Sequence, residues 1–106
     1  ELSKIASIQT PKVASTNTHA YHLYTIRCTN RNDYVEFMKK NDVEIRLMYP
    51  CPIHLMTAYQ HLNYPLGSLP VTERLRNEIC SLPLHIHLRE AEIEKILNLT
   101  HKFFQR

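Results

Sequence analysis

Hydrophobic side chains recur at every second position over residues 43–49, which is the period of a strand with one covered face. The residues on that face are Val43, Ile45, Leu47 and Tyr49. Residues 20–28 are rich in aromatic and β-branched side chains and predict a strand covered in part on both faces. A shorter strand is predicted over residues 80–85, where Pro83 restricts it to an edge or a bulged position.

Helical spacing of apolar residues marks the other elements. Helices are predicted between residues 34 and 41, between 71 and 80, and from about residue 89 to the end of the chain, with a short helical piece at 57–62. Residues 30–33 offer side chains that cap the first helix, and Pro70 suits the entrance of the second. The last helix has acidic residues in its first turns and basic residues in its last, the order that the helix dipole favours.

The order of these elements predicts the fold class. Residues 1–18 are polar, rich in Ser and Thr, and contain Pro11, so they are expected to form a lead-in segment with at most a short strand or helix end. The packed domain is expected over residues 19–106. A small, mainly antiparallel sheet with helices packed on it would cover all the apolar faces, which makes this a two-layer α+β domain.

Composition then excludes several classes of function. Gly67 is the one glycine among 106 residues, whereas phosphate-binding loops such as G-x-G-x-x-G and the P-loop need several glycines at fixed offsets. Thirteen Lys and Arg against ten Asp and Glu give a net charge of +3 without a basic stripe, so no nucleic-acid partner is expected. No apolar run approaches the roughly 20 residues of a membrane helix, so no membrane partner is expected.

Cysteine and histidine usage adds little chemistry. The three cysteines are an odd number with no C-x-x-C spacing, and we expect reduced thiols in a cytoplasmic protein. Seven histidines invite a metal interpretation, but the pairs His19 with His22 and His85 with His87 have no carboxylate or thiolate to complete a ligand set. We therefore expect no metal site.

The proline-flanked loop at residues 50–52 is the feature best suited to position side chains. Two fixed φ angles, and the restriction that each proline places on the preceding residue, hold its backbone extended and rigid. Tyr49 and His54 lie on either side of this loop.

Several segments of this chain, taken together and in order, resemble the C-terminal small domain of the DegT/DnrJ/EryC1/StrS family. The segments are HAYHLYTIR at 19–27, EIRLMYPCPIHL at 44–55, Ala58-Tyr59, GSLPVTE at 67–73 and LPLH at 82–85. Members are mostly sugar aminotransferases that use pyridoxal phosphate (PLP) and have the aspartate aminotransferase fold. The resemblance covers almost the whole chain, and the combination is far more specific than any single motif.

The resemblance implies a part of an enzyme that transfers an amino group from a donor, usually glutamate, to a nucleotide-linked keto sugar. It also implies a homodimeric parent whose absent N-terminal domain supplies the aldimine lysine and most of the cofactor site. The six lysines here lie in the lead-in or on polar helix faces and ends, so no catalytic or cofactor-binding residue is assigned to this chain. We expect this chain alone to bind no PLP and to be inactive. Its first residue is Glu1 and not Met, as expected of a processed or excised piece.

The resemblance also implies substrate-facing residues in the loop that the family writes His-Tyr-Pro-x-Pro-x-His. Tyr49 and His54 match that pattern, Met48 replaces its first histidine, and Asp42 stands where glycine is common. We predict substrate contacts from Tyr49, His54, Arg46 and Met48. For Tyr49 the alternative is a core aromatic, for His54 a hydrogen-bonded structural histidine, and for Arg46 a solvated arginine.

Two other functions stay open. The first is a free-standing module that binds a ligand or dimerises through the loop between Tyr49 and His54, without catalysis. The second is a family member that keeps the fold but performs dehydration or serves regulation in place of transamination.

Overall fold

The sheet at the centre of the computed structural model, which describes residues 1–105, has three antiparallel strands in the order β1-β2-β3. These are β1 (Ile8–Gln9), β2 (Tyr24–Cys28) and β3 (Ile79–Leu82). β2 lies in the middle, with Tyr24 opposite Leu82 of β3 and Cys28 opposite Ile8 of β1. The antiparallel sheet and its helices confirm the predicted α+β class.

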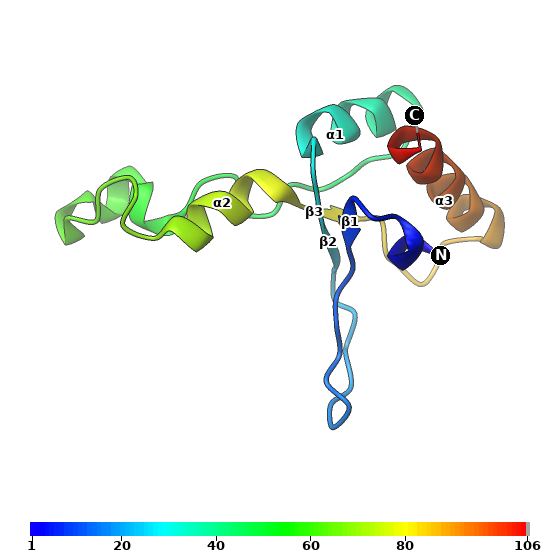
Figure 1. Cartoon of the computed structure of the whole chain (residues 1–106), viewed down its shortest axis with the longest axis horizontal. Helices are drawn as coiled ribbons and strands as arrows, with labels where there is room; N and C mark the ends of the chain where they lie inside the picture. The colour runs from blue at the N-terminus through cyan, green and yellow to red at the C-terminus, as the bar shows by residue number, and fades with distance from the viewer. Residues whose placement is uncertain (106) are drawn as a thin grey trace.

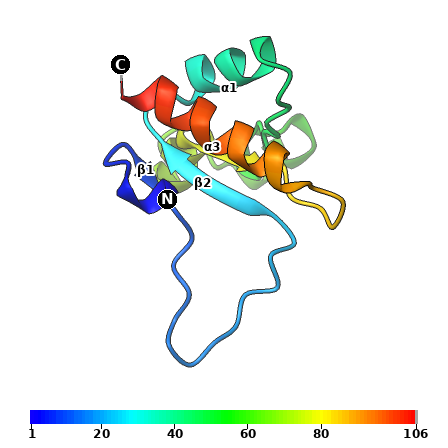
Figure 2. The same cartoon turned by 90° about the vertical axis from the view of Figure 1, so that its right-hand side faces the viewer.

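Three α-helices surround this sheet: α1 (Arg31–Lys40), α2 (Pro70–Glu78) and α3 (Glu90–Phe104). Figure 1 and Figure 2 show α3 lying across one side of the sheet with α1 beside it, while α2 leads away from the opposite side. Three short 3-10 helices complete the secondary structure of the described residues: η1 (Leu2–Lys4), η2 (Ile53–Leu55) and η3 (Thr57–Leu62). The predicted helices are confirmed, and η3 coincides with the expected piece at 57–62.

Local sequence explains where the helices begin. Pro70 takes the first turn of α2, where its missing N–H leaves no hydrogen bond unmade. In α3 the Arg89 N–H donates to the Glu92 carboxylate at 2.9 Å, and the Arg89 side chain and amide lower the pKa of Glu92 to about 2. At α1 the prediction was wrong in detail, because the Asn30 side chain makes no cap hydrogen bond.

Apolar side chains from the sheet, α1 and α3 form the core. Ile26 of β2 and Tyr34 of α1 are 0% exposed, and the Tyr34 hydroxyl lies 2.9 Å from the Thr100 hydroxyl of α3. The ring of Tyr34 also packs against Phe103 and Phe104, with centroids 5.4 and 5.0 Å away. On α3, Ile96 and Thr100 are buried and face the core, whereas Ile93 is 45% exposed.

The first nine residues contribute to this core, which the predicted lead-in over 1–18 did not include. Leu2, Ile5 and Ile8 are all buried, and β1 pairs with β2. Leu2 and Ile5 lie one turn of the 3-10 helix apart, and Ile8 reaches the core from β1. Residues 12–22, by contrast, are exposed and belong to the long loop between β1 and β2 that projects from the domain in Figure 1.

The strand predicted over 43–49 was wrong, because the structure gives this segment one isolated bridge and no strand. Val43 and Ile45 are buried, and Arg46 forms a single antiparallel bridge with Ser81 at the outer edge of β3. Tyr49 then adopts a φ of 60° and precedes a proline that has no N–H to donate, so pairing cannot continue. As a result Leu47 is 39% exposed, although its spacing places it with Val43 and Ile45.

The predicted strand over 20–28 is also shorter than expected, and it begins at Tyr24. Tyr21 has a φ of 48°, and its N–H donates to Nδ1 of His19 at 2.8 Å, which turns the chain before the strand. At the other edge, β3 ends at Leu82, directly before Pro83. This end agrees with the proline effect predicted for residues 80–85.

Residues 50–69, which we call the arm, carry η2 and η3 away from the core at the left of Figure 1. The arm and the β1–β2 loop make the molecule extended, with dimensions of 48 × 37 × 27 Å and a radius of gyration of 15.8 Å. A compact chain of this length has a radius of gyration of about 13 Å. The candidate site residues lie where the core gives way to the arm.

Candidate functional site

Arg46 lies on a groove of about 560 Å³ between the segment at 42–46, the end of β3 and the start of α3. Lys95 adds a second positive charge, and Asp42, Glu44 and Glu92 add three negative ones. The rest of the lining is Ser81, Pro83 and His85 together with six apolar side chains: Leu23, Val43, Leu82, Leu84, Leu88 and Ile96. Because Arg46 is exposed and has no ion-pair partner within residues 1–105, its guanidinium is available to a phosphate or a carboxylate.

Tyr49 is not a core residue, so that alternative is wrong. Its side chain is 69% exposed, and its left-handed backbone turns it away from the face of Val43 and Ile45. Met48, which replaces the family histidine, is half-buried next to it. The loop thus presents an aromatic ring at the base of the arm, where another surface can pack against it.

His54, in η2, is one of the few buried residues of the arm. Its side chain is 6% exposed, and its Nε2 lies 2.9 Å from Oε1 of Glu73 in α2. Pro52, two residues earlier, is also buried, and its carbonyl accepts the Leu55 N–H at 2.9 Å. The proline-flanked loop is therefore fixed to α2 through an imidazole.

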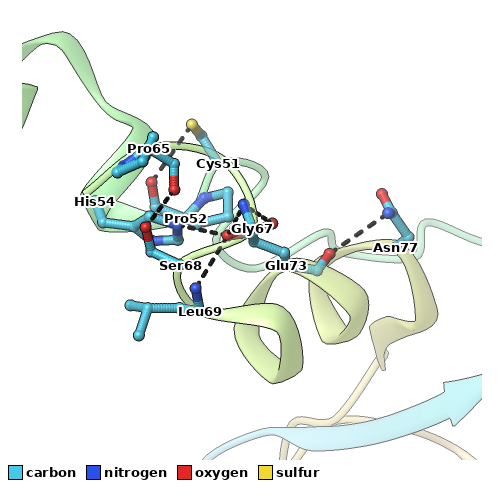
Figure 3. Close-up of polar contacts among 9 residues, drawn as sticks. All are labelled: Cys51, Pro52, His54, Pro65, Gly67, Ser68, Leu69, Glu73 and Asn77. Atoms are coloured by element: carbon cyan, nitrogen blue, oxygen red, sulfur yellow. Dashed lines mark hydrogen bonds and ion pairs between the residues drawn. The ribbon is translucent and has the colours of Figure 1, made fainter.

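The carboxylate of Glu73 accepts hydrogen bonds from three residues (Figure 3). Besides His54, it accepts the Gly67 N–H, 2.9 Å from each of its oxygens, and the Leu69 N–H at 3.2 Å. The hydrogen bond from His54, followed by those from the two backbone amides, holds the pKa of Glu73 below its ordinary value. Glu73 is thus an ionised acceptor at neutral pH that joins both sides of the arm.

Gly67 shapes the turn that brings these amides to Glu73. The Ser68 N–H donates to the Pro65 carbonyl at 3.1 Å across Leu66 and Gly67, and Gly67 has a φ of +93°. A turn with positive φ at its third residue favours glycine there. A Cβ at Gly67 would meet nothing within 4 Å, so backbone conformation and not space is the reason for glycine.

A second hollow, of about 510 Å³, lies within the arm beside His54. The other residues that line it are Leu55, Gln60, Asn63, Tyr64 and Pro65. Two amides, a phenol and an imidazole around an open hollow suit a ligand that offers several hydrogen-bonding groups.

The four predicted substrate residues do not form one pocket. Arg46 lines the groove at the sheet edge, His54 lines the hollow in the arm, and Tyr49 and Met48 lie on the chain between them. The structural alternative for His54, a hydrogen bond that fixes the ring, describes its contact with Glu73. Glu73 itself was given no role from the sequence, because it lies four residues after the Leu69 N-cap, one more than in a capping box, and still accepts the Leu69 N–H.

The lysines do not fit a covalent cofactor site. All six side chains are exposed: Lys4, Lys12, Lys39, Lys40, Lys95 and Lys102. A lysine that forms an imine needs a lowered pKa, which a desolvated site provides and a solvated surface does not. Within residues 1–105, no group of three His, Cys, Asp or Glu side chains is arranged to hold a metal ion. No helix in that range is long and apolar enough to cross a membrane.

Comparison with known proteins identifies relatives of this chain. A family model described as the DegT/DnrJ/EryC1/StrS aminotransferase family matches residues 1–100. A dTDP-3-amino-3,4,6-trideoxy-alpha-D-glucose transaminase from Micromonospora megalomicea subsp. nigra is 36% identical over 80% of this chain and 23% of its own length. The erythromycin biosynthesis sensory transduction protein EryC1 from Saccharopolyspora erythraea is 38% identical over 93% of this chain and 27% of its own.

The fold has counterparts among solved structures. DesV of S. venezuelae, in complex with a ketimine intermediate, superposes with a TM-score of 0.93 and 27% identity over 99% of this chain and 28% of its own. The chain thus spans about a quarter of the length of the relatives that it matches. Because the family model matches residues 1–100, this chain belongs to the DegT/DnrJ/EryC1/StrS aminotransferase family.

Proposed function

We propose that this chain is the C-terminal portion of a PLP-dependent transaminase that moves an amino group from glutamate to a nucleotide-linked keto sugar. The observation that carries the proposal is the match to two dTDP-sugar transaminases. It covers 80% and 99% of this chain and about a quarter of the length of each enzyme. PLP supplies the electron sink that such a transfer needs. Because every lysine side chain of this chain is exposed, we assign the attachment of PLP to the rest of the polypeptide.

In this proposal the chain contributes substrate contacts. Arg46 is an exposed guanidinium beside a groove and suits an anionic group of the substrate. His54 lines a hollow with amide side chains and suits a sugar hydroxyl. Tyr49 and Met48 supply apolar contact between these two sites. All four act by binding and orienting, which limits the sugar to one pose at the reacting carbon.

The surface of the arm supports a covering partner. Six large apolar side chains of the arm are exposed: Ile53, Tyr59, Leu62, Tyr64, Leu66 and Leu69. A monomer rarely leaves so many apolar groups together on its surface. We assign their partner to the preceding domain of the parent enzyme, within a homodimer. Three free cysteines accord with a cytoplasmic location, where thiols stay reduced.

The test is to express the whole polypeptide that carries this chain and to supply PLP, glutamate and a dTDP-linked keto sugar. We expect an aminated sugar nucleotide and one 2-oxoglutarate per turnover. Arg46→Ala should raise KM for the sugar nucleotide, whereas Glu94→Gln, an exposed change on α3, should leave it unchanged. A polypeptide that has no PLP-binding lysine outside these 106 residues would contradict the proposal.

The chain alone gives a second test. We expect no stable PLP adduct on its lysines after reduction with borohydride, and we expect it to bind a hydrophobic dye through the exposed arm. A chain that binds no dye and does not aggregate would favour the free-standing module in place of an enzyme part.

A regulatory role is a second candidate function, favoured by one observation. EryC1, at 38% identity, is named a sensory transduction protein. A folded, PLP-free polypeptide with no transaminase activity would move the conclusion to this role.

A further inference from the structure

Glu73 is the structural centre of the arm, because its carboxylate is the point where three separate segments meet. The segments are η2 through His54, the turn through Gly67, and the N-cap of α2 through Leu69. The two interacting side chains are shielded from water, with His54 6% and Glu73 15% exposed. Such a contact is less screened by solvent than a surface pair.

The contact determines which nitrogen of His54 carries a proton. An ionised carboxylate accepts hydrogen bonds and donates none, so Nε2 must be the protonated nitrogen that donates to Glu73. In the neutral ring Nδ1 then keeps its lone pair. Within residues 1–105 Nδ1 makes no hydrogen bond, and the ring lines the hollow of the arm. The ring atom left for a ligand is therefore an acceptor.

We propose that Glu73 is a positioning residue that fixes His54 as its Nε2–H tautomer and so makes Nδ1 the acceptor for a hydroxyl group of the sugar substrate. The ligand assignment rests on the proposed function, but the state of the ring does not. A ring held the other way would offer an N–H in place of a lone pair, so the hydroxyl would have to accept the hydrogen bond and direct its own proton to another acceptor.

Three substitutions separate this role from a purely structural one, in which Glu73 only holds the arm in place. Glu73→Gln keeps an amide oxygen that can accept from Nε2–H, whereas Glu73→Ala removes the acceptor altogether. Gly67→Ala strains the turn but leaves the carboxylate in place, so it reports what loosening alone does. Glu94→Gln is the matched control, because it makes the same change on an exposed helical position.

The first readout is nitrogen NMR of the whole polypeptide labelled with 15N-histidine, with His54 assigned through His54→Gln. We expect an Nε2–H resonance in slow exchange with water in the wild type and in the Glu73→Gln and Gly67→Ala variants, and its loss in Glu73→Ala. This readout needs no enzyme activity. An Nδ1–H tautomer in the wild type, or an Nε2–H resonance that survives in Glu73→Ala, would overturn the proposal even if the polypeptide is a transaminase.

The second readout is KM for the sugar nucleotide, measured against kcat for the glutamate half-reaction. Glu73→Ala should raise KM about tenfold, the loss expected for one hydrogen bond, and leave the glutamate half-reaction unchanged. Glu73→Gln should stay within about threefold of wild type. A contrary outcome is that Gly67→Ala raises KM as much as Glu73→Ala does while keeping the Nε2–H resonance. In that case Glu73 only holds the arm in place, and the assignment of Nδ1 as the substrate acceptor fails. A polypeptide that shows the resonance pattern but no transamination refutes the proposed function and, with it, the sugar as the ligand.

Discussion

The core and the arm of this domain are stabilised in different ways. In the core, Ile26, Tyr34, Met38 and Thr100 are 0% exposed, and most of the contacts that bury them are apolar. In the arm, every residue from 57 to 69 is exposed, and the buried members His54 and Pro52 lie near its base. What fixes the arm is a carboxylate that accepts an imidazole and two backbone amides.

This difference predicts two kinds of response. Stability that comes from apolar burial depends on side-chain volume and changes little with pH. Stability that comes from hydrogen bonds to a carboxylate depends on its charge and on the geometry of its donors. Substitutions in the core should therefore affect global unfolding, whereas changes around Glu73 should act first on the local opening of the arm.

The largest effect is expected from Ile26→Ala at the centre of the sheet. Removing a fully buried side chain costs about 2–5 kcal/mol, which is a large share of the stability of a small domain. Urea unfolding measures the loss, and Val71→Ala, at a position that is 59% exposed, is the control. Amide exchange in the arm should not change. If Gly67 and Leu69 exchange faster in Ile26→Ala by the same factor as the core does, the arm does not open on its own.

A smaller loss of stability is expected at the buried hydroxyl pair of Tyr34 and Thr100, and it should be larger for one substitution than for the other. The Thr100 hydroxyl donates its one proton to the Ile96 carbonyl at 2.7 Å, so the Tyr34 hydroxyl must be the donor to Thr100. Thr100→Val leaves the Tyr34 hydroxyl buried without an acceptor and should cost about 1–3 kcal/mol, against about 1 kcal/mol for Tyr34→Phe. The double variant should be more stable than Thr100→Val alone. The opposite order in thermal or urea unfolding would mean that Tyr34 is not the donor.

Within the arm, Gly67→Ala should cost about 1–2 kcal/mol through the positive φ alone, since an added Cβ meets nothing within 4 Å. The substitution destabilises the native state relative to both the open arm and the unfolded chain. Exchange of the Leu69 amide and of the Ile26 amide should therefore both become faster. This result contrasts with Ile26→Ala, which should change the core alone, and equal behaviour of the two variants would remove the distinction between the regions.

The smallest effect is expected from acid. Because the pKa of Glu73 is lowered in the folded chain, its stabilisation is present above the unfolded value of about 4.3 and is lost as pH falls through the folded value. The amide resonances of Gly67 and Leu69 should shift in that window while those of β2 stay constant. Glu73→Gln should abolish the shift, and Glu94→Gln should leave it as in the wild type. Arm resonances that do not respond below about pH 4 would show that the carboxylate does not order the arm.

Sequence patterns were most informative where a local rule determines the structure. Pro70 marks the start of α2, Pro83 follows the end of β3, and helical spacing located α1 and α3. Each of these signals acts on residues close by in the sequence, so contacts with distant residues did not override the predicted structure. The resemblance to the family added the overall fold, which the superposition on DesV with a TM-score of 0.93 bears out.

Patterns failed where distant contacts or backbone conformation decide. Alternation predicted Tyr49 on the face of Val43, but a positive φ at Tyr49 ends the extended segment before the pattern is complete. The contact between His54 and Glu73 joins residues that are 19 apart, and no periodicity encodes such a pair. Leu2, Ile5 and Ile8 did carry a signal, a spacing of three residues, which the polar composition around them obscured.

The exposed loop between β1 and β2 has a consequence for how the chain can be divided. β1 is held by its pairing with β2 and by the burial of Leu2, Ile5 and Ile8, while residues 12–22 contribute no buried side chain. A protease cut within that loop would turn an intramolecular contact into a complex of two chains, and the tether would no longer supply an effective concentration. The N-terminal segment would then be a peptide ligand of its own domain, with a dissociation constant that titration can measure.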